Sequence, residues 1–158
     1  AREMTDKPHI MVVEARFYED LSDELAKGAL GALDQIGATY ERVAVPGALE
    51  IPAAIQIAVK SMEIRVSARR RYDGYVALGC VIRGETTHYD HVCGESIRGL
   101  QELAMRHTLA VGMGILTCEN RDQAWARASV AKGNLGGRAV RACLRMLEVK
   151  RYFHLWPR

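Results

Sequence analysis

The length, composition and charge of the chain are those of a small globular protein. It has 158 residues, of which 49% are hydrophobic and 26% are charged, so we interpret residues 1–158 as a single domain. The formal net charge of +3 is small and dispersed, which argues against nucleic acid as a partner. Residues 1–8 are polar and are predicted to be flexible. No apolar run approaches the length of a membrane span, so we expect no membrane partner and a cytoplasmic protein.

The four cysteines indicate neither a metal site nor a disulfide framework. Successive cysteines are 13, 25 and 25 residues apart, and none forms a pair with zinc-binding spacing. We predict four reduced, mostly buried thiols, and no metal ligands. These cysteines are Cys80, Cys93, Cys118 and Cys143.

The first half of the chain alternates between strand and helix patterns. A short apolar run over 10–13 predicts a buried strand. Apolar residues at helical spacing predict a helix over 21–36, which Gly37 ends. The side chains of residues 39–45 follow the alternating pattern of a strand and include many strand-forming types, which predicts a second strand. Residues 51–62 place their apolar side chains on one face of a helix, which predicts a second helix.

The second half repeats this alternation after an arginine-rich stretch. Residues 63–73 hold four arginines without a clear period, which predicts a helix end and an exposed loop. An apolar strand is predicted over 74–82, a helix with apolar residues over 92–104, and a strand over 109–116. Two more helices are predicted at 122–130 and about 137–151, the last with Val140, Cys143, Met146 and Leu147 facing inward and Arg138, Arg141 and Arg145 outward.

This order of elements predicts an α/β fold. Repeated strand–helix–strand units favour a four-stranded parallel sheet with helices on both faces, a three-layer αβα sandwich. Ligands of such folds bind at the carboxyl ends of the strands. Phe17, the 46–50 turn and the 83–88 loop each follow a predicted strand, so we expect them to converge on one pocket.

The 83–88 loop has the chemistry of an anion site. Glu85, Thr86 and Thr87 lead into a predicted helix, whose free backbone N–H groups favour a bound anion. The same pattern equally fits simple helix capping by a threonine. His88 is next, and a histidine there either transfers protons near neutral pH or caps and packs.

Other strand-end residues also have two interpretations. Glu50 either complements the dipole of its helix or accepts hydrogen bonds from a sugar, together with backbone groups of Ala48 and Leu49. Phe17 either stacks on a flat heterocycle or packs within the protein. Arg127 is either a surface arginine or a phosphate clamp.

Five segments, in order along the chain, carry a resemblance to a known family. The segments are Ala15-Arg16-Phe17, Val45-Pro46-Gly47-Ala48-Leu49-Glu50-Ile51-Pro52, Leu78-Gly79-Cys80-Val81-Ile82-Arg83-Gly84-Glu85-Thr86-Thr87-His88-Tyr89-Asp90, Gly114-Ile115-Leu116-Thr117 and Gln123-Ala124-Trp125-Ala126-Arg127-Ala128. Together they resemble the lumazine synthases over residues 11–147, which implies a flavodoxin-like fold. The implied reaction condenses 5-amino-6-(D-ribitylamino)uracil with 3,4-dihydroxy-2-butanone 4-phosphate, without a metal or a redox cofactor.

The resemblance also implies a role for individual residues. Members of this family act as homopentamers or multiples of pentamers, with sites between subunits, so Met113 and Arg127 are expected to reach in from the adjacent chain. The expected roles are stacking on the pyrimidine ring for Phe17, contacts to the ring and ribityl chain for Ala48, Leu49, Glu50, Val81, Ile82 and Met113, phosphate binding for Glu85, Thr86 and Arg127, and proton transfer for His88.

Several positions depart from the family pattern. The family often has asparagine in place of Tyr18, phenylalanine in place of Met113, and lysines at Ala131 and Leu135, where this chain has only the neighbouring Lys132. The tail at 152–158 is unusually aromatic and has no amphipathic period. Two alternatives therefore remain at this stage: a pentameric or shell-forming scaffold with little catalysis, and a flavodoxin-like protein that binds a flavin.

Overall fold

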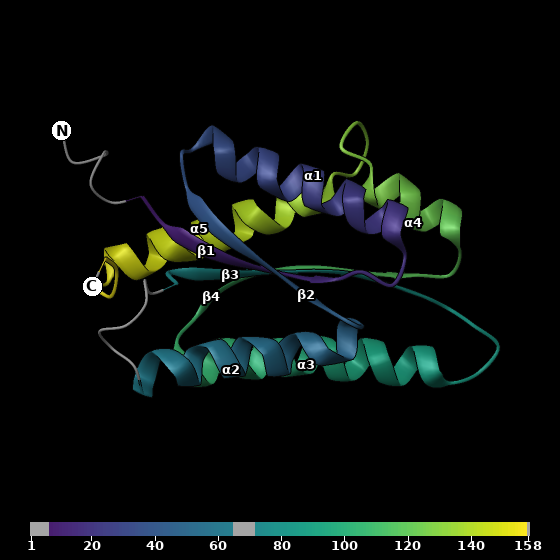
Figure 1. Ribbon diagram of the computed structural model, residues 1–158, viewed down its shortest axis with the longest axis horizontal. Helices are drawn as coiled ribbons and strands as arrows, with labels where there is room; N and C mark the ends of the chain where they lie inside the picture. Colours follow the sequence, from purple (N-terminus) through teal and green to yellow (C-terminus); the bar gives the residue numbers. More distant parts are fainter. Residues whose placement is uncertain (1–6, 65–71, 158) are drawn as a thin grey trace.

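The computed structural model describes residues 7–64 and 72–157 (Figure 1). Most of the predicted flexible segment at 1–8 and of the predicted basic loop at 63–73 therefore lies outside the described residues.

A single parallel sheet organises the described chain. Its strands are β1 (His9–Ala15), β2 (Thr39–Val45), β3 (Gly74–Ile82) and β4 (Ala110–Cys118), in the order β2-β1-β3-β4. Because all the strands are parallel, their carboxyl ends meet at one edge of the sheet. The predicted fold class is confirmed.

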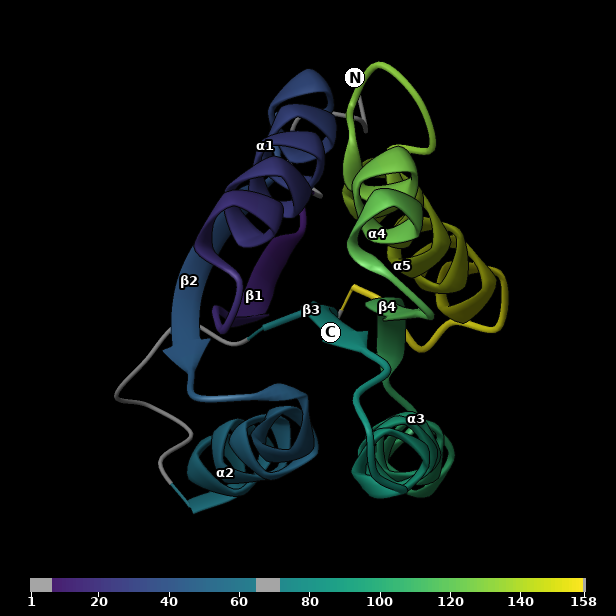
Figure 2. The same ribbon diagram turned by 90° about the vertical axis from the view of Figure 1, so that its right-hand side faces the viewer.

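Helices cover both faces of the sheet, which gives three layers (Figure 2). On one face lie α1 (Glu19–Gln35), α4 (Arg121–Ala128) and α5 (Leu135–Tyr152); on the other lie α2 (Ile51–Ile64) and α3 (His88–His107). A short 3₁₀ helix, η1 (Ala48–Glu50), joins β2 to α2.

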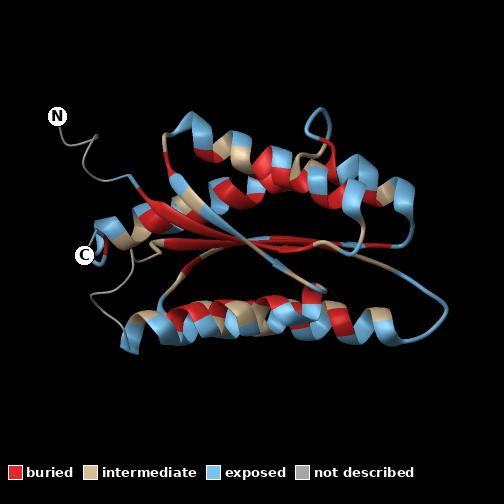
Figure 3. Ribbon diagram, in the orientation of Figure 1, coloured by how far each residue is buried: buried red, intermediate tan, exposed pale blue. Residues whose placement is uncertain are grey.

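Two apolar clusters fill the spaces between these layers. Alternate residues of a strand point to opposite faces, so Val12 packs toward α1 and α5 whereas Val13 packs toward α2. The central strands β1 and β3 are buried along most of their length (Figure 3). They provide a rigid support for the loops at their carboxyl ends.

Glycines allow α5 to approach its neighbours closely. A Cβ at Gly112 would lie 1.9 Å from the carbonyl oxygen of Ala139, and one at Gly136 would lie 2.0 Å from that of Leu25. No side chain fits at these distances, so the backbone of α5 contacts both β4 and α1 directly.

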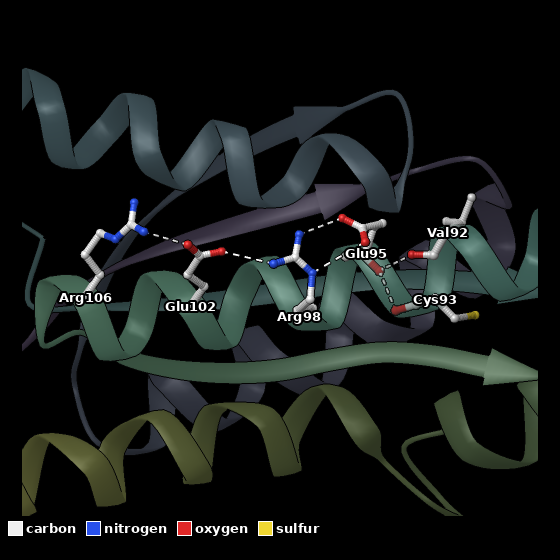
Figure 4. Close-up of polar contacts among 7 residues, drawn as sticks. Val92, Cys93, Glu95, Arg98, Glu102 and Arg106 are labelled. Atoms are coloured by element: carbon white, nitrogen blue, oxygen red, sulfur yellow. Dashed lines mark hydrogen bonds and ion pairs between the residues drawn. The ribbon is translucent and has the colours of Figure 1, made fainter.

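The exposed face of α3 carries a row of alternating acidic and basic side chains (Figure 4). Arg98 bonds Glu95 at 2.8 Å and Glu102 at 3.2 Å, and Arg106 bonds Glu102 at 2.7 Å. Ion pairs three or four residues apart stabilise a solvated helix face modestly.

The end of the chain contains one wrong prediction, at Met146, and an aromatic tail whose position the sequence left open. Met146, predicted to face inward, is 44% exposed, because it lies beside Met105 and Phe153 in a shallow groove away from the core. The aromatic tail packs on its own chain through Trp156, which is buried in the cluster next to α1 and α5. The guanidinium of Arg151 lies 4.4 Å from the centroid of the Trp156 ring.

Candidate active site

A pocket of about 420 Å³ lies at the carboxyl edge of the sheet. The β1–α1 turn, the 46–50 turn, the end of β3 and the start of α3 contribute to it. The predicted convergence of the three strand-end segments is therefore confirmed, with His88 as the member from the third segment. The lining residues are Phe17, Tyr18, Pro46, Gly47, Ala48, Leu49, Glu50, Cys80, Val81, Ile82, His88 and Val92.

A buried carboxylate fixes the β1–α1 turn. Glu14, at the end of β1, is 2% exposed and accepts bonds from Arg16 Nη1 at 2.8 Å and from Arg42 Nε at 2.6 Å. Paired in this way, the carboxylate is stable at a buried position. The turn therefore leaves β1 in a defined direction, and Phe17 follows it into the pocket.

The apolar part of the pocket presents side chains that are unusually exposed. Phe17 is 74% exposed and Leu49 is 50% exposed, whereas Val81 and Ile82 are half-buried at the end of β3. An open aromatic ring beside aliphatic side chains is suited to a flat heterocycle.

Two polar side chains line the same pocket. Glu50 is the last residue of η1 and directly precedes α2, and its backbone N–H donates a hydrogen bond to the carbonyl oxygen of Gly47 at 3.2 Å. His88 is the first residue of α3 and is exposed. A carboxylate and an imidazole in the lining of one pocket are able to bind hydroxyl groups and transfer protons.

Two threonines precede α3, and only one of them caps the helix through its side chain. The hydroxyl of Thr86 accepts a hydrogen bond from the backbone N–H of His88 at 3.3 Å, whereas the N-cap residue Thr87 makes no side-chain cap bond. Thr86 therefore takes part in capping. Its hydroxyl proton remains available for an anion at the helix N-terminus.

Four predicted site residues lie outside the pocket lining. Glu85 and Thr86 are exposed on the loop before α3. Met113 is 41% exposed on the edge strand β4. Arg127 is exposed on α4, where its Nη1 bonds the carbonyl oxygen of Gln123 at 3.2 Å. One chain thus gathers the predicted ring contacts other than Met113 into the pocket, but leaves Arg127 outside it.

Comparison with known proteins identifies the family. The model of the 6,7-dimethyl-8-ribityllumazine synthase family matches residues 7–151. The chain belongs to the lumazine synthase family. It is 56% identical to 6,7-dimethyl-8-ribityllumazine synthase 1 of Rhizobium meliloti (strain 1021) over 142 residues, 90% of this chain and 91% of that protein. It is 52% identical to the 6,7-dimethyl-8-ribityllumazine synthase of Bartonella tribocorum over 152 residues, 96% of each chain.

One arginine beside the candidate site was not predicted. Arg83 begins the loop before α3, and its Nε bonds Glu119 after β4 at 2.8 Å. Its guanidinium also lies 4.4 Å from the centroid of the Tyr89 ring. The bond to Glu119 raises the pKa of Arg83. Arg83 thus holds the candidate phosphate loop against the β4–α4 turn, a contact that no local pattern indicates.

The pocket also contains one of the thiols that were predicted to be buried. Cys80 lines the pocket, and burial raises its pKa to about 12. Such a thiol is almost entirely protonated at neutral pH and is a poor nucleophile. Among residues 7–64 and 72–157, no group of three or more His, Cys, Asp or Glu side chains is arranged to hold a metal ion.

Proposed function

We propose that this chain catalyses the condensation of 5-amino-6-(D-ribitylamino)uracil with 3,4-dihydroxy-2-butanone 4-phosphate to 6,7-dimethyl-8-ribityllumazine, the penultimate step of riboflavin biosynthesis. The family match over residues 7–151 carries the proposal. The pocket supports it, because Phe17, Glu50 and His88 line one space at the carboxyl edge of the sheet. The enzyme is a transferase that acts on two small molecules.

The pyrimidine diamine occupies the pocket in this proposal. Its ring stacks on the open face of Phe17, and Val81 and Ile82 contact the ring edge. Ala48, Leu49 and Glu50 hold the ribityl chain, with the Glu50 carboxylate accepting hydrogen bonds from hydroxyl groups.

The butanone phosphate binds next to the ring, at the start of α3. Its phosphate is bound by Glu85 and Thr86 with the N-terminus of the helix, and it is neutralised by Arg127. The amine of the diamine attacks the ketone and water leaves to form an imine. Phosphate is then eliminated, and the ring closes with loss of a second water.

The protein contributes mainly by positioning the two substrates. Holding them together replaces a bimolecular encounter with a reaction within one complex. Arg127 and the N–H donors stabilise the leaving phosphate, and His88 transfers protons at the amine and the imine.

We infer that the active form is a homopentamer or a multiple of pentamers, in which Met113 and Arg127 complete the site of an adjacent chain. The exposure of both residues outside the pocket supports this arrangement. Large apolar side chains of α2 and α3 are also open to solvent, which favours an interface there. They include Ile57, Ile64 and Met105, which are 69%, 70% and 76% exposed.

We place this reaction in the cytoplasm. The four cysteines are free thiols, which is typical of proteins in a reducing compartment. Among the described residues, no helix is both long and apolar enough to cross a membrane.

The decisive experiment mixes purified protein with both substrates and follows phosphate release together with lumazine fluorescence. We expect the two signals to rise together, and each to depend on both substrates. A folded oligomer that releases no phosphate would contradict the proposed reaction and would favour a structural scaffold. Protein that is yellow when purified would instead indicate tight flavin binding.

A further inference from the structure

We propose that Tyr18 is a positioning residue, which holds the ring of Phe17 in the orientation needed to stack on the pyrimidine. The inference rests on the proposed function, because it concerns the same pocket. It assigns a role to a residue at which this chain departs from the asparagine common in its family.

The ring of Phe17 is largely exposed, so few neighbouring groups restrain it. Its side chain is 74% exposed, and it packs edge-to-face on Tyr18, with ring centroids 5.0 Å apart and planes at 80°. An exposed side chain otherwise samples several rotamers, and ordering it on binding costs free energy. An edge-to-face contact favours one orientation before the substrate arrives.

Tyr18 is itself held from several sides. It is half-buried and packs against the apolar cluster next to α1 and α5. Its carbonyl oxygen accepts the N–H of Ser22 at 2.8 Å, which fixes its backbone at the start of α1. The ring is therefore an anchored surface for Phe17.

A residue of α4, which is distant in the sequence, also lies over the Tyr18 ring. The guanidinium of Arg121, the first residue of α4, lies 6.0 Å from the centroid of Tyr18, and Arg121 also forms an ion pair with Asp20 of α1. The two contacts join residues about a hundred positions apart in the chain. They restrain the Tyr18 ring from the side of α4.

The ring of Tyr18, and not its hydroxyl group, carries this role. Burial raises the pKa of Tyr18, so the phenol stays protonated at neutral pH and supplies no base. Because Tyr18 also lines the pocket, the test must separate positioning from direct contact between its hydroxyl and the substrate.

The test compares Tyr18→Phe, which keeps the ring, with Tyr18→Leu, which removes it. We expect Tyr18→Leu to raise the KM for the pyrimidine diamine about two- to fivefold, because the binding free energy of one aromatic contact corresponds to a change of that size. The KM for the butanone phosphate should stay within about twofold, and Tyr18→Phe, which keeps the ring, should hold the diamine KM closer to that of the unmodified protein than to that of Tyr18→Leu. Arg121→Gln should raise the diamine KM less than Tyr18→Leu does.

A double-mutant cycle with Phe17→Leu identifies the mechanism. If Tyr18 acts through Phe17, Tyr18→Leu adds no further loss when Phe17 is already leucine. Additive losses, or a Tyr18→Phe variant as impaired as Tyr18→Leu, would overturn the proposal. Thermal unfolding of each variant checks that the fold is retained.

Separate measurements on the unmodified protein show whether the proposed function itself is wrong. If the unmodified protein neither binds the diamine by calorimetry nor releases phosphate, the proposed reaction is wrong. The positioning role is then judged from crystal structures of the unmodified and Tyr18→Leu proteins. A Phe17 ring equally ordered in both would overturn it, and a ring ordered only beside Tyr18 would support it.

Discussion

The ring half and the phosphate half of the proposed site differ in how much of each one chain assembles. The ring half is a pocket of about 420 Å³ lined by residues from four segments of the chain. The phosphate half is an exposed loop at Glu85 and Thr86, and an arginine on α4 outside the pocket lining. One chain thus gathers the proposed ring contacts other than Met113 into one pocket, whereas the proposed phosphate contacts lie outside its lining.

The position of each half in the sheet explains the difference. The pocket lies where the central strands β1 and β3 end, and both strands have a neighbour on each side. Arg127 belongs to α4, which follows β4, an edge strand of the sheet. Residues at an edge are open to a neighbouring protein, so we expect the two halves to respond differently to substitution.

Replacing Arg127 with alanine should have the largest effect. We expect kcat/KM to fall on the order of 10²–10³-fold, because the variant loses a cation that stabilises the leaving phosphate. Unfolding temperature should change little, since Arg127 is exposed. Steady-state phosphate release measures the first effect, and Arg138→Ala, an exposed arginine on α5, is the matched control.

A mixture of two impaired variants then tests where Arg127 acts. Phe17→Ala and Arg127→Ala chains are unfolded together and reassembled in equal amounts. If each site takes Phe17 from one chain and Arg127 from its neighbour, about a quarter of the sites are intact in a random mixture. No recovery of activity would mean that both residues serve the same chain's site, and that the two halves are not shared.

Replacing His88 with alanine should have the next largest effect. We expect kcat to fall about ten- to a hundredfold, because general acid–base catalysis is lost while exposed parts of the site still exchange protons with water. His91→Ala is the matched control, being an exposed histidine one turn further along α3. An unchanged kcat would remove His88 from the mechanism.

Replacing Phe17 with leucine should weaken the ring half alone. The KM for the diamine should rise about three- to tenfold as aromatic stacking is lost, and the KM for the butanone phosphate should stay within about twofold. Phe153→Leu makes the same change in the tail, where Phe153 is 65% exposed, and should leave both constants unchanged. Equal increases for both substrates would show that the two halves are not independent.

Replacing Lys132 with alanine should have the smallest effect. Lys132 is exposed, and its described hydrogen bond is made by its backbone N–H to Ser129. A solvated lysine contributes little, so we expect less than about a twofold change in the KM for the butanone phosphate. A tenfold increase would show that Lys132 replaces the lysines that the family often carries at 131 and 135.

Local patterns in the sequence determined the order of elements and much of the ring half. Apolar periods of two and of about 3.6 residues identify strands and helices, and parallel strands must end at one edge of the sheet. Phe17, the 46–50 turn and His88 follow strand ends in the sequence, so their meeting in one pocket was predictable. Helix ends were predicted less well: α4 ends at Ala128, not at residue 130, and α5 begins at Leu135, not near residue 137.

Only the tertiary structure decided which distant residues meet. Arg83 pairs with Glu119 and Arg121 covers Tyr18 because the fold brings the β3–α3 loop, the β4–α4 turn and the β1–α1 turn together. Met146 fits the helical period yet is exposed, and Trp156 lies beyond that period yet is buried. A period shows which residues share a face of a helix, but burial of that face depends on whether another element covers it.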